Sequence, residues 1–203
     1  MAKHPYQDLI EAFDQIPGIG PKAAQRMTDA CLKYKLRDES SGSNDGLAVG
    51  LQLALQQAMS RLQYCPTCQY LMLDNACGQC DSTPGQSIAY WVVETIEQAN
   101  TITAANSNVR FFVLHGVISP TAGIGPQQLH IGRVVEWLSH ISASSNKADP
   151  IIINFLLPDS IEGQITMDFI QRSINKVRDD IECRLRSTKE LQAVLVNSPE
   201  GST

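Results

Sequence analysis

Apolar residues in the first sixty positions recur at the spacing of a helix. Those between Leu9 and Ile16 predict a short amphipathic helix over residues 6–16. Two further helices are expected at 22–36 and 47–62, and Pro21 suits the first position of the earlier one. The polar segment 38–46 lies between them and has little to bury.

The pattern changes in the second half of the chain, where apolar residues form short continuous runs. These runs predict buried strands at 88–93, 111–114 and 151–157. Helices are expected between and after them, at 96–105, 127–141 and 165–178. Strands that alternate with helices in this way predict an α/β sheet whose strands are largely parallel. The whole chain is therefore expected to be an α+β protein of several parts.

Two Cys-x-x-Cys pairs precede the first predicted strand. Cys65 and Cys68 form one pair, Cys77 and Cys80 form the other, and residues 69–76 separate them. Four thiolates can close a tetrahedral shell with no open position, which is typical of a structural zinc site with one ion per chain. The alternatives are a redox dithiol or a pair of disulfides. We favour zinc, because thioredoxin-like Cys-x-x-Cys motifs do not occur in twos.

Composition limits the compartment and the partners. The 203 residues carry a formal charge of −5, and the chain has no stretch near the roughly 18 apolar residues that span a membrane. We expect no signal peptide, and we expect free thiols at Cys31 and Cys183, which suits the reducing cytoplasm. Residues 1–37 contain six basic and four acidic groups, a local balance of +2. Contact with DNA is therefore expected near this end.

The first two predicted helices are joined by a turn rich in proline and glycine. Gly18 and Gly20 permit close approach of a ligand to the backbone, and the following helix offers unpaired N–H groups at its positive end. Lys22 and Arg26 place positive charge beside it, one helical turn apart. These features predict a helix–hairpin–helix that holds DNA phosphates without reading sequence. The plainer interpretation is a corner that only turns the chain.

Residues 16–27, with the sequence Ile-Pro-Gly-Ile-Gly-Pro-Lys-Ala-Ala-Gln-Arg-Met, resemble the signature hairpin of the bacterial recombination protein RecR family. The four cysteines follow at that family's position and spacing. Four further segments resemble parts of the family's Toprim domain, and they are 92–94, 112–120, 123–126 and the acidic turn 161–163. The resemblance covers roughly residues 8 to 180, and it identifies the chain as a divergent member.

The resemblance implies a mediator of DNA recombination and repair that is not an enzyme. Members form ring-like homo-oligomers, act with RecO and in many bacteria RecF at gapped DNA, and help RecA to load. The implied domains are a helical part with the hairpin (1–62), a zinc finger (63–84), a Toprim-like α/β domain (85–180) and a divergent C-terminal segment (181–203). No membrane contact is expected.

The chain departs from the family's pattern where Toprim enzymes hold Mg²⁺. Glu94 matches the first carboxylate, but Gln98 stands where the family has Asp, and the later strand lacks Asp-x-Asp at 154–157. Glu94 and Glu162 are then candidates for contacting a partner or a weakly held Mg²⁺. The alternative functions are a Mg²⁺-dependent Toprim nuclease or nucleotidyl transferase, and an adaptor that does not bind DNA.

The other residues with chemical potential are expected to be structural. Trp91 and Trp137 are interpreted as packing residues rather than as platforms for stacking bases. His115, His130 and His140 lack ligand spacing and are expected to be structural or solvent-facing.

Overall fold

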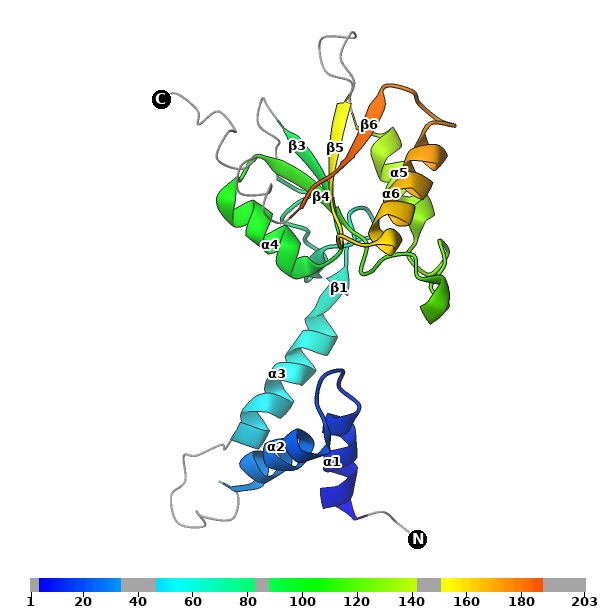
Figure 1. Cartoon of the computed structure of the whole chain (residues 1–203). Helices are drawn as coiled ribbons and strands as arrows, with labels where there is room; N and C mark the ends of the chain where they lie inside the picture. The colour runs from blue at the N-terminus through cyan, green and yellow to red at the C-terminus, as the bar shows by residue number, and fades with distance from the viewer. Residues whose placement is uncertain (1–3, 34–46, 83–87, 142–150, 188–203) are drawn as a thin grey trace. The chain divides into compact units, whose positions relative to one another are not determined.

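The computed structural model describes residues 4–33, 47–82, 88–141 and 151–187. Contacts divide the chain into two compact units, residues 1–62 and 63–203 (Figure 1). The predicted loops at 38–46 and 142–149, the last residues of the 22–36 helix and the segment beyond 187 lie outside the described residues. The four-part domain division stays a prediction.

The first unit begins with two helices that pack on each other, α1 (Pro5–Asp14) and α2 (Pro21–Lys33). Phe13 from α1 and the α2 stripe of Ala24 and Cys31 form their common core. The Tyr6 hydroxyl also donates a hydrogen bond of 2.7 Å to the Asp29 carboxylate. These contacts fix the angle between the helices and hold the turn between them at the surface.

The third helix of this unit, α3 (Leu47–Arg61), buries none of its residues. Many apolar side chains are exposed along it, and these are Leu47, Val49, Leu51, Leu53, Leu55 and Met59. Residues of α3 line an open apolar groove of about 780 Å³ together with residues of α1 and α2. The groove gives this unit an unusually apolar surface.

The second unit contains a four-stranded sheet in the order β4-β3-β5-β6. Its strands are β3 (Ala89–Val93), β4 (Val109–Val113), β5 (Ile151–Leu156) and β6 (Ile181–Leu185). Every neighbouring pair is parallel, which confirms the predicted sheet. Parallel strands are buried on both faces, and this explains why three of them are continuous apolar runs.

Helices cover both faces of the sheet (Figure 1). Helix α4 (Ile96–Ala105) packs on the face that carries Trp91 and Val93. Helices α5 (Ile131–Ser139) and α6 (Ile161–Ile174) pack on the opposite face, against Val92 and Phe112. A short 3-10 helix, η1 (Pro120–Ala122), lies between β4 and α5 in the chain.

Two helices begin four residues away from their predicted first residue. Helix α6 begins at Ile161 instead of 165, because the Ser160 side chain caps it by accepting a hydrogen bond of 3.3 Å from the Gly163 N–H. The segment 161–163, expected as an acidic turn before the helix, is therefore the first turn of α6. Helix α5 begins at Ile131 instead of 127, because His130 has a left-handed φ of 50° that interrupts the helix.

The structure also has a strand that the apolar pattern did not predict, β6 at residues 181–185. This strand lies at the edge of the sheet, and charged and apolar residues alternate along it. Glu182 and Arg184 pair with each other in solvent at 2.7 Å. An alternating edge strand of five residues has a weaker apolar signal than the buried strands beside it.

Candidate metal centre and nucleic-acid interface

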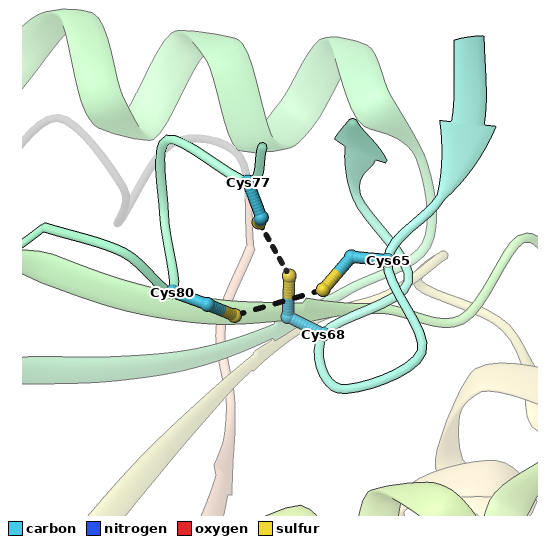
Figure 2. Close-up of side chains that lie close together, drawn as sticks. All are labelled: Cys65, Cys68, Cys77 and Cys80. Atoms are coloured by element: carbon cyan, nitrogen blue, oxygen red, sulfur yellow. Dashed lines mark hydrogen bonds between the residues drawn. The ribbon is translucent and has the colours of Figure 1, made fainter. Parts of the chain in front are cut away.

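The four cysteines come together in a small knuckle built around two short strands, β1 (Leu62–Tyr64) and β2 (Leu71–Leu73). Their four sulfur atoms lie within 4.8 Å of one another, and three of the residues are buried while Cys80 is exposed. Figure 2 shows that the close pairs join the two halves of the motif, with Cys65 beside Cys80 and Cys68 beside Cys77. All four thiols are free.

The sulfur spacing distinguishes a metal site from disulfides. Both close pairs have Sγ–Sγ distances of 3.7 Å. Bonded sulfurs would lie about 2.05 Å apart, whereas a tetrahedron with Zn–S bonds of about 2.3 Å has edges of about 3.8 Å. The arrangement therefore fits a tetrahedral thiolate site, and the predicted four-cysteine cluster is confirmed as a group that could hold a metal ion.

The thiols of the cluster differ in acidity. A hydrogen bond with Cys68 lowers the pKa of Cys80 to about 6, and the same interaction raises the pKa of Cys68 well above its usual range. Burial of Cys77 raises its pKa as well. The lowered pKa of Cys80 favours its thiolate, the form that binds metals.

The knuckle is attached to the edge of the sheet by several contacts. The Cys68 carbonyl accepts a hydrogen bond of 2.9 Å from the Val113 N–H of β4. The His115 Nε2 atom lies 2.8 Å from the Gln69 carbonyl oxygen, and the Tyr70 ring meets the Phe111 ring edge-on at 5.1 Å. The cysteine cluster is therefore part of the same unit as the sheet.

The hairpin predicted from the glycine-rich turn lies between α1 and α2. Gly18 has a left-handed φ of 84°, and a Cβ atom at Gly18 or Gly20 would meet nothing within 4 Å. Lys22 and Arg26 are exposed on the first two turns of α2. Only Ile19 of the turn packs inward, against the core shared by the two helices. Within this unit the turn is therefore open to a ligand.

Backbone donors are also available at this turn. The carbonyl of Gly20 accepts the N–H groups of Ala23 and Ala24 at 2.9 and 3.0 Å, so the first turn of α2 is well formed. Among the described residues, the N–H groups of Gly18, Gly20 and Lys22 have no recorded acceptor. Unpaired N–H groups at a helix N-terminus attract anions, and two exposed cations add to that attraction.

Glu94 lies at the carboxyl end of β3, the position expected from the resemblance. Burial raises the pKa of its carboxyl group. Gln98, which replaces the family's Asp, has a structural role here. Its Oε1 atom accepts hydrogen bonds from the N–H groups of Glu94 (2.9 Å) and Thr95 (3.1 Å) and so completes a capping box for α4.

The other Toprim-related positions are also occupied by side chains with structural partners. Asn154 of β5 donates to the Tyr90 carbonyl at 3.4 Å and accepts from Arg186 at 2.9 Å. Glu162 lies in the first turn of α6. Among the described residues, the cysteines form the one group of three or more metal-ligating side chains, and neither Glu94 nor Glu162 belongs to such a group.

One residue that the sequence analysis assigned to packing lies at an open pocket. Trp91 is fully buried, but Trp137 is partly exposed and lines a cavity with Arg133 and His140. Arg133 and Trp137 are four residues apart on α5, and His140, the C-cap residue, follows three residues later. Helical spacing was therefore the signal that could have grouped them. His115 lies against Tyr64, with ring centroids 4.5 Å apart.

No helix in the described part of the chain is both long and apolar enough to span a membrane.

Comparison with known proteins agrees with the hairpin and the overall organisation. The family model described as RecR, helix-hairpin-helix, matches residues 6–39. The recombination protein RecR of Pseudomonas syringae pathovar tomato is 31% identical over 169 residues, which cover 83% of this chain and 77% of that protein. RecR of Legionella pneumophila strain Philadelphia 1 is 31% identical over 167 residues, covering 81% and 75% of the two chains.

A third relative, RecR of Coxiella burnetii, is 37% identical over 135 residues, or 65% of this chain and 62% of its own. The matched hairpin, the clustered cysteines and the helices around a parallel sheet together confirm the expected α+β organisation. The chain therefore belongs to the RecR family of recombination proteins.

Proposed function

We propose that this protein is a DNA-binding mediator of recombination repair and that its N-terminal hairpin holds the DNA backbone. The observation that carries the proposal is the open turn at 18–20, with three unpaired N–H groups beside exposed Lys22 and Arg26. These groups suit a phosphate, which every nucleotide carries, and they offer nothing that would read a base. Binding is therefore expected to be independent of sequence and weakened by salt.

The proposal is tested by the double variant Lys22→Ala, Arg26→Ala. Its affinity for duplex DNA, measured by fluorescence anisotropy at several salt concentrations, should fall. The slope of log K against log salt should decrease in magnitude by about 2, because two phosphate contacts are lost. Lys33→Ala removes an exposed charge from the far end of the same helix and serves as the control. Equal losses in the double variant and the control would refute the hairpin assignment.

A single structural zinc ion on Cys65, Cys68, Cys77 and Cys80 belongs to this proposal. The ion would supply no chemistry of its own at a closed four-sulfur site, and its role would be to hold the knuckle together. A segment with two strands of three residues each buries too little apolar surface to fold alone. The 3.7 Å sulfur spacing across the motif supports this role.

The α/β unit is proposed to act in docking and without catalysis. Its support is the use of Gln98 as a helix cap and of Asn154 as a link between strands, at positions where Mg²⁺-dependent Toprim enzymes need carboxylates. Family membership supports RecO, and in some settings RecF, as partners at gapped DNA, with RecA loading as the outcome. Glu94 and Glu162, near the carboxyl ends of β3 and β5, are proposed as partner contacts.

Assembly into a homo-oligomer completes the proposal. The exposed apolar residues of α3 and the groove of about 780 Å³ beside it support this, because a monomer rarely leaves such a surface in water. A second copy of the chain could bury the same surface symmetrically.

A further inference from the structure

A pocket of about 460 Å³ lies in the second unit, between the first turn of the cysteine knuckle and helix α5. The knuckle contributes one wall and a single face of α5 contributes the other. Its lining residues are Pro66, Thr67, Arg133, Glu136, Trp137 and His140. Pockets that take small organic ligands have volumes of about 300–1,000 Å³, so this cavity is large enough for one nucleotide unit.

The indole of Trp137 packs against two other rings and is partly exposed. The Tyr90 ring lies 6.2 Å from it in a T-shaped contact, and the Phe112 ring lies 5.9 Å away at a tilt of 52°. Both partners belong to the sheet beneath α5. Trp137 therefore enters the pocket as a rigid aromatic surface, and a ligand that stacks on it would not have to order it first.

Charged and polar groups surround this aromatic surface. Arg133 on α5 and His140, the C-cap residue of that helix, are exposed, and they precede and follow Trp137 in the chain. Among the described residues, Arg133 makes no side-chain hydrogen bond or ion pair. Glu136 contributes a carboxylate, so the pocket is not purely cationic. A free phosphate or an acidic peptide would favour cations alone. An aromatic ring beside one arginine and a carboxylate suits a base and its adjoining phosphate better.

We propose that this pocket takes an unpaired base of single-stranded DNA, which stacks on Trp137 while Arg133 contacts the neighbouring phosphate. The inference rests on the proposed DNA-binding function and adds to it a preference for unpaired nucleotides. Duplex DNA keeps its bases stacked on each other and cannot present one to the pocket. The hairpin would then hold the backbone of any DNA, and this second site would recognise the single-stranded part of a gap.

The first test compares a short oligothymidylate with blunt duplex DNA in binding to the full chain. Trp137→Leu should weaken oligothymidylate binding by about 5-fold to 150-fold, the range expected for one lost base stack. Arg133→Ala should also weaken it, because a phosphate contact is lost, and both variants should leave duplex affinity unchanged. Arg172→Ala removes an exposed arginine from α6, outside the pocket, and is the matched control. Equal oligothymidylate affinity in all three variants and the wild type would overturn the proposal.

Salt dependence separates the roles of the two residues. Arg133→Ala should reduce the magnitude of the salt slope by about 1, because a phosphate contact is lost. Trp137→Leu should leave the slope unchanged, because stacking releases no counterions. The assigned roles would be contradicted if the salt slope changed in Trp137→Leu and stayed the same in Arg133→Ala.

A second readout needs no change at Trp137. Thymidine monophosphate should quench the emission of the wild-type protein, since Trp137 lies at the pocket while Trp91 is fully buried and constant. Quenching should be weaker in Arg133→Ala and intact in Lys22→Ala, Arg26→Ala. If Lys22→Ala, Arg26→Ala keeps the duplex affinity of the wild type while quenching persists, the hairpin's proposed role in DNA binding is refuted and the nucleotide pocket at Trp137 is supported. If thymidine monophosphate in large excess does not quench the emission of the wild-type protein, the proposal that this pocket binds a nucleotide is refuted.

Discussion

Gly163 shows how one residue without a side chain determines the place of a functional element. A Cβ atom at this position would overlap the carbonyl oxygen of Pro158, so only glycine allows the first turn of α6 to pack this closely on the segment that follows β5. The Ser160 N–H donates to the same carbonyl at 2.8 Å, and the Ser160 side chain caps Gly163. This tight start holds Glu162 near the carboxyl end of the sheet.

Gly163→Ala should therefore lower the free energy of unfolding by about 1–3 kcal/mol, the usual range for overpacking a close contact. Gly132→Ala is the control, because a Cβ atom there meets nothing within 4 Å and the residue lies in helix α5. The free energy of unfolding of that variant, measured by urea denaturation, should stay the same or rise by up to about 1 kcal/mol. Identical midpoints for the two variants would contradict the steric argument.

At the scale of elements, the sequence predicted those with a strong local signal. Helix α4 was predicted at its observed bounds, and the buried strands were found within two residues, because continuous apolar runs mark strands that are covered on both faces. The errors have local causes that periodicity does not contain. The serine cap of α6, the left-handed His130 before α5 and the alternating edge strand β6 all depend on hydrogen bonds or backbone angles.

The site was predictable to a similar degree. The cysteine spacing and the glycine turn identified the hairpin and the group that could hold a metal ion, because both are built from residues close in sequence. The pocket at Trp137 was missed because its walls come from segments about 70 residues apart. The attachment of the knuckle to β4 was missed for the same reason.

The knuckle is the element whose metal dependence can be measured directly. Protein purified without chelator should contain about one zinc ion per chain, and Cys68→Ser should lose it and melt at a lower temperature. Cys183→Ser should keep the ion, because this thiol lies on β6 and burial raises its pKa to about 12. Metal analysis and thermal melting test both variants, and a wild-type protein free of zinc would exclude the site.

On the scale of the whole molecule, two compact units carry different tasks in the proposed function. The hairpin and the apolar helix α3 lie in residues 1–62, whereas the cysteine knuckle and the sheet lie in residues 63–203. Binding to DNA backbone and assembly would thus belong to the first unit. Recognition of partners and of unpaired bases would belong to the second.

Substitutions on α3 should test assembly without touching the hairpin. Met59 is 84% exposed and Leu55 is 54% exposed, and both line the apolar groove. Leu55→Glu with Met59→Glu should reduce the molecular mass found by light scattering towards that of one chain, 22.3 kDa. Gln57→Glu adds a charge to the same helix outside the groove and should leave the mass unchanged. An unaltered mass in the double variant would show that copies meet elsewhere.

The hydrogen bond from the Val113 N–H to the Cys68 carbonyl has a consequence for aggregation of the protein on storage. Strand β4 ends the sheet on one side, and the knuckle occupies part of that border. Stripping the metal would loosen the knuckle and leave backbone groups of a hydrophobic strand ready to pair with other molecules. Protein treated with a chelator should then become turbid on storage, while untreated protein should stay clear. The cysteine cluster would in that case prevent aggregation as well as stabilise the fold of the knuckle.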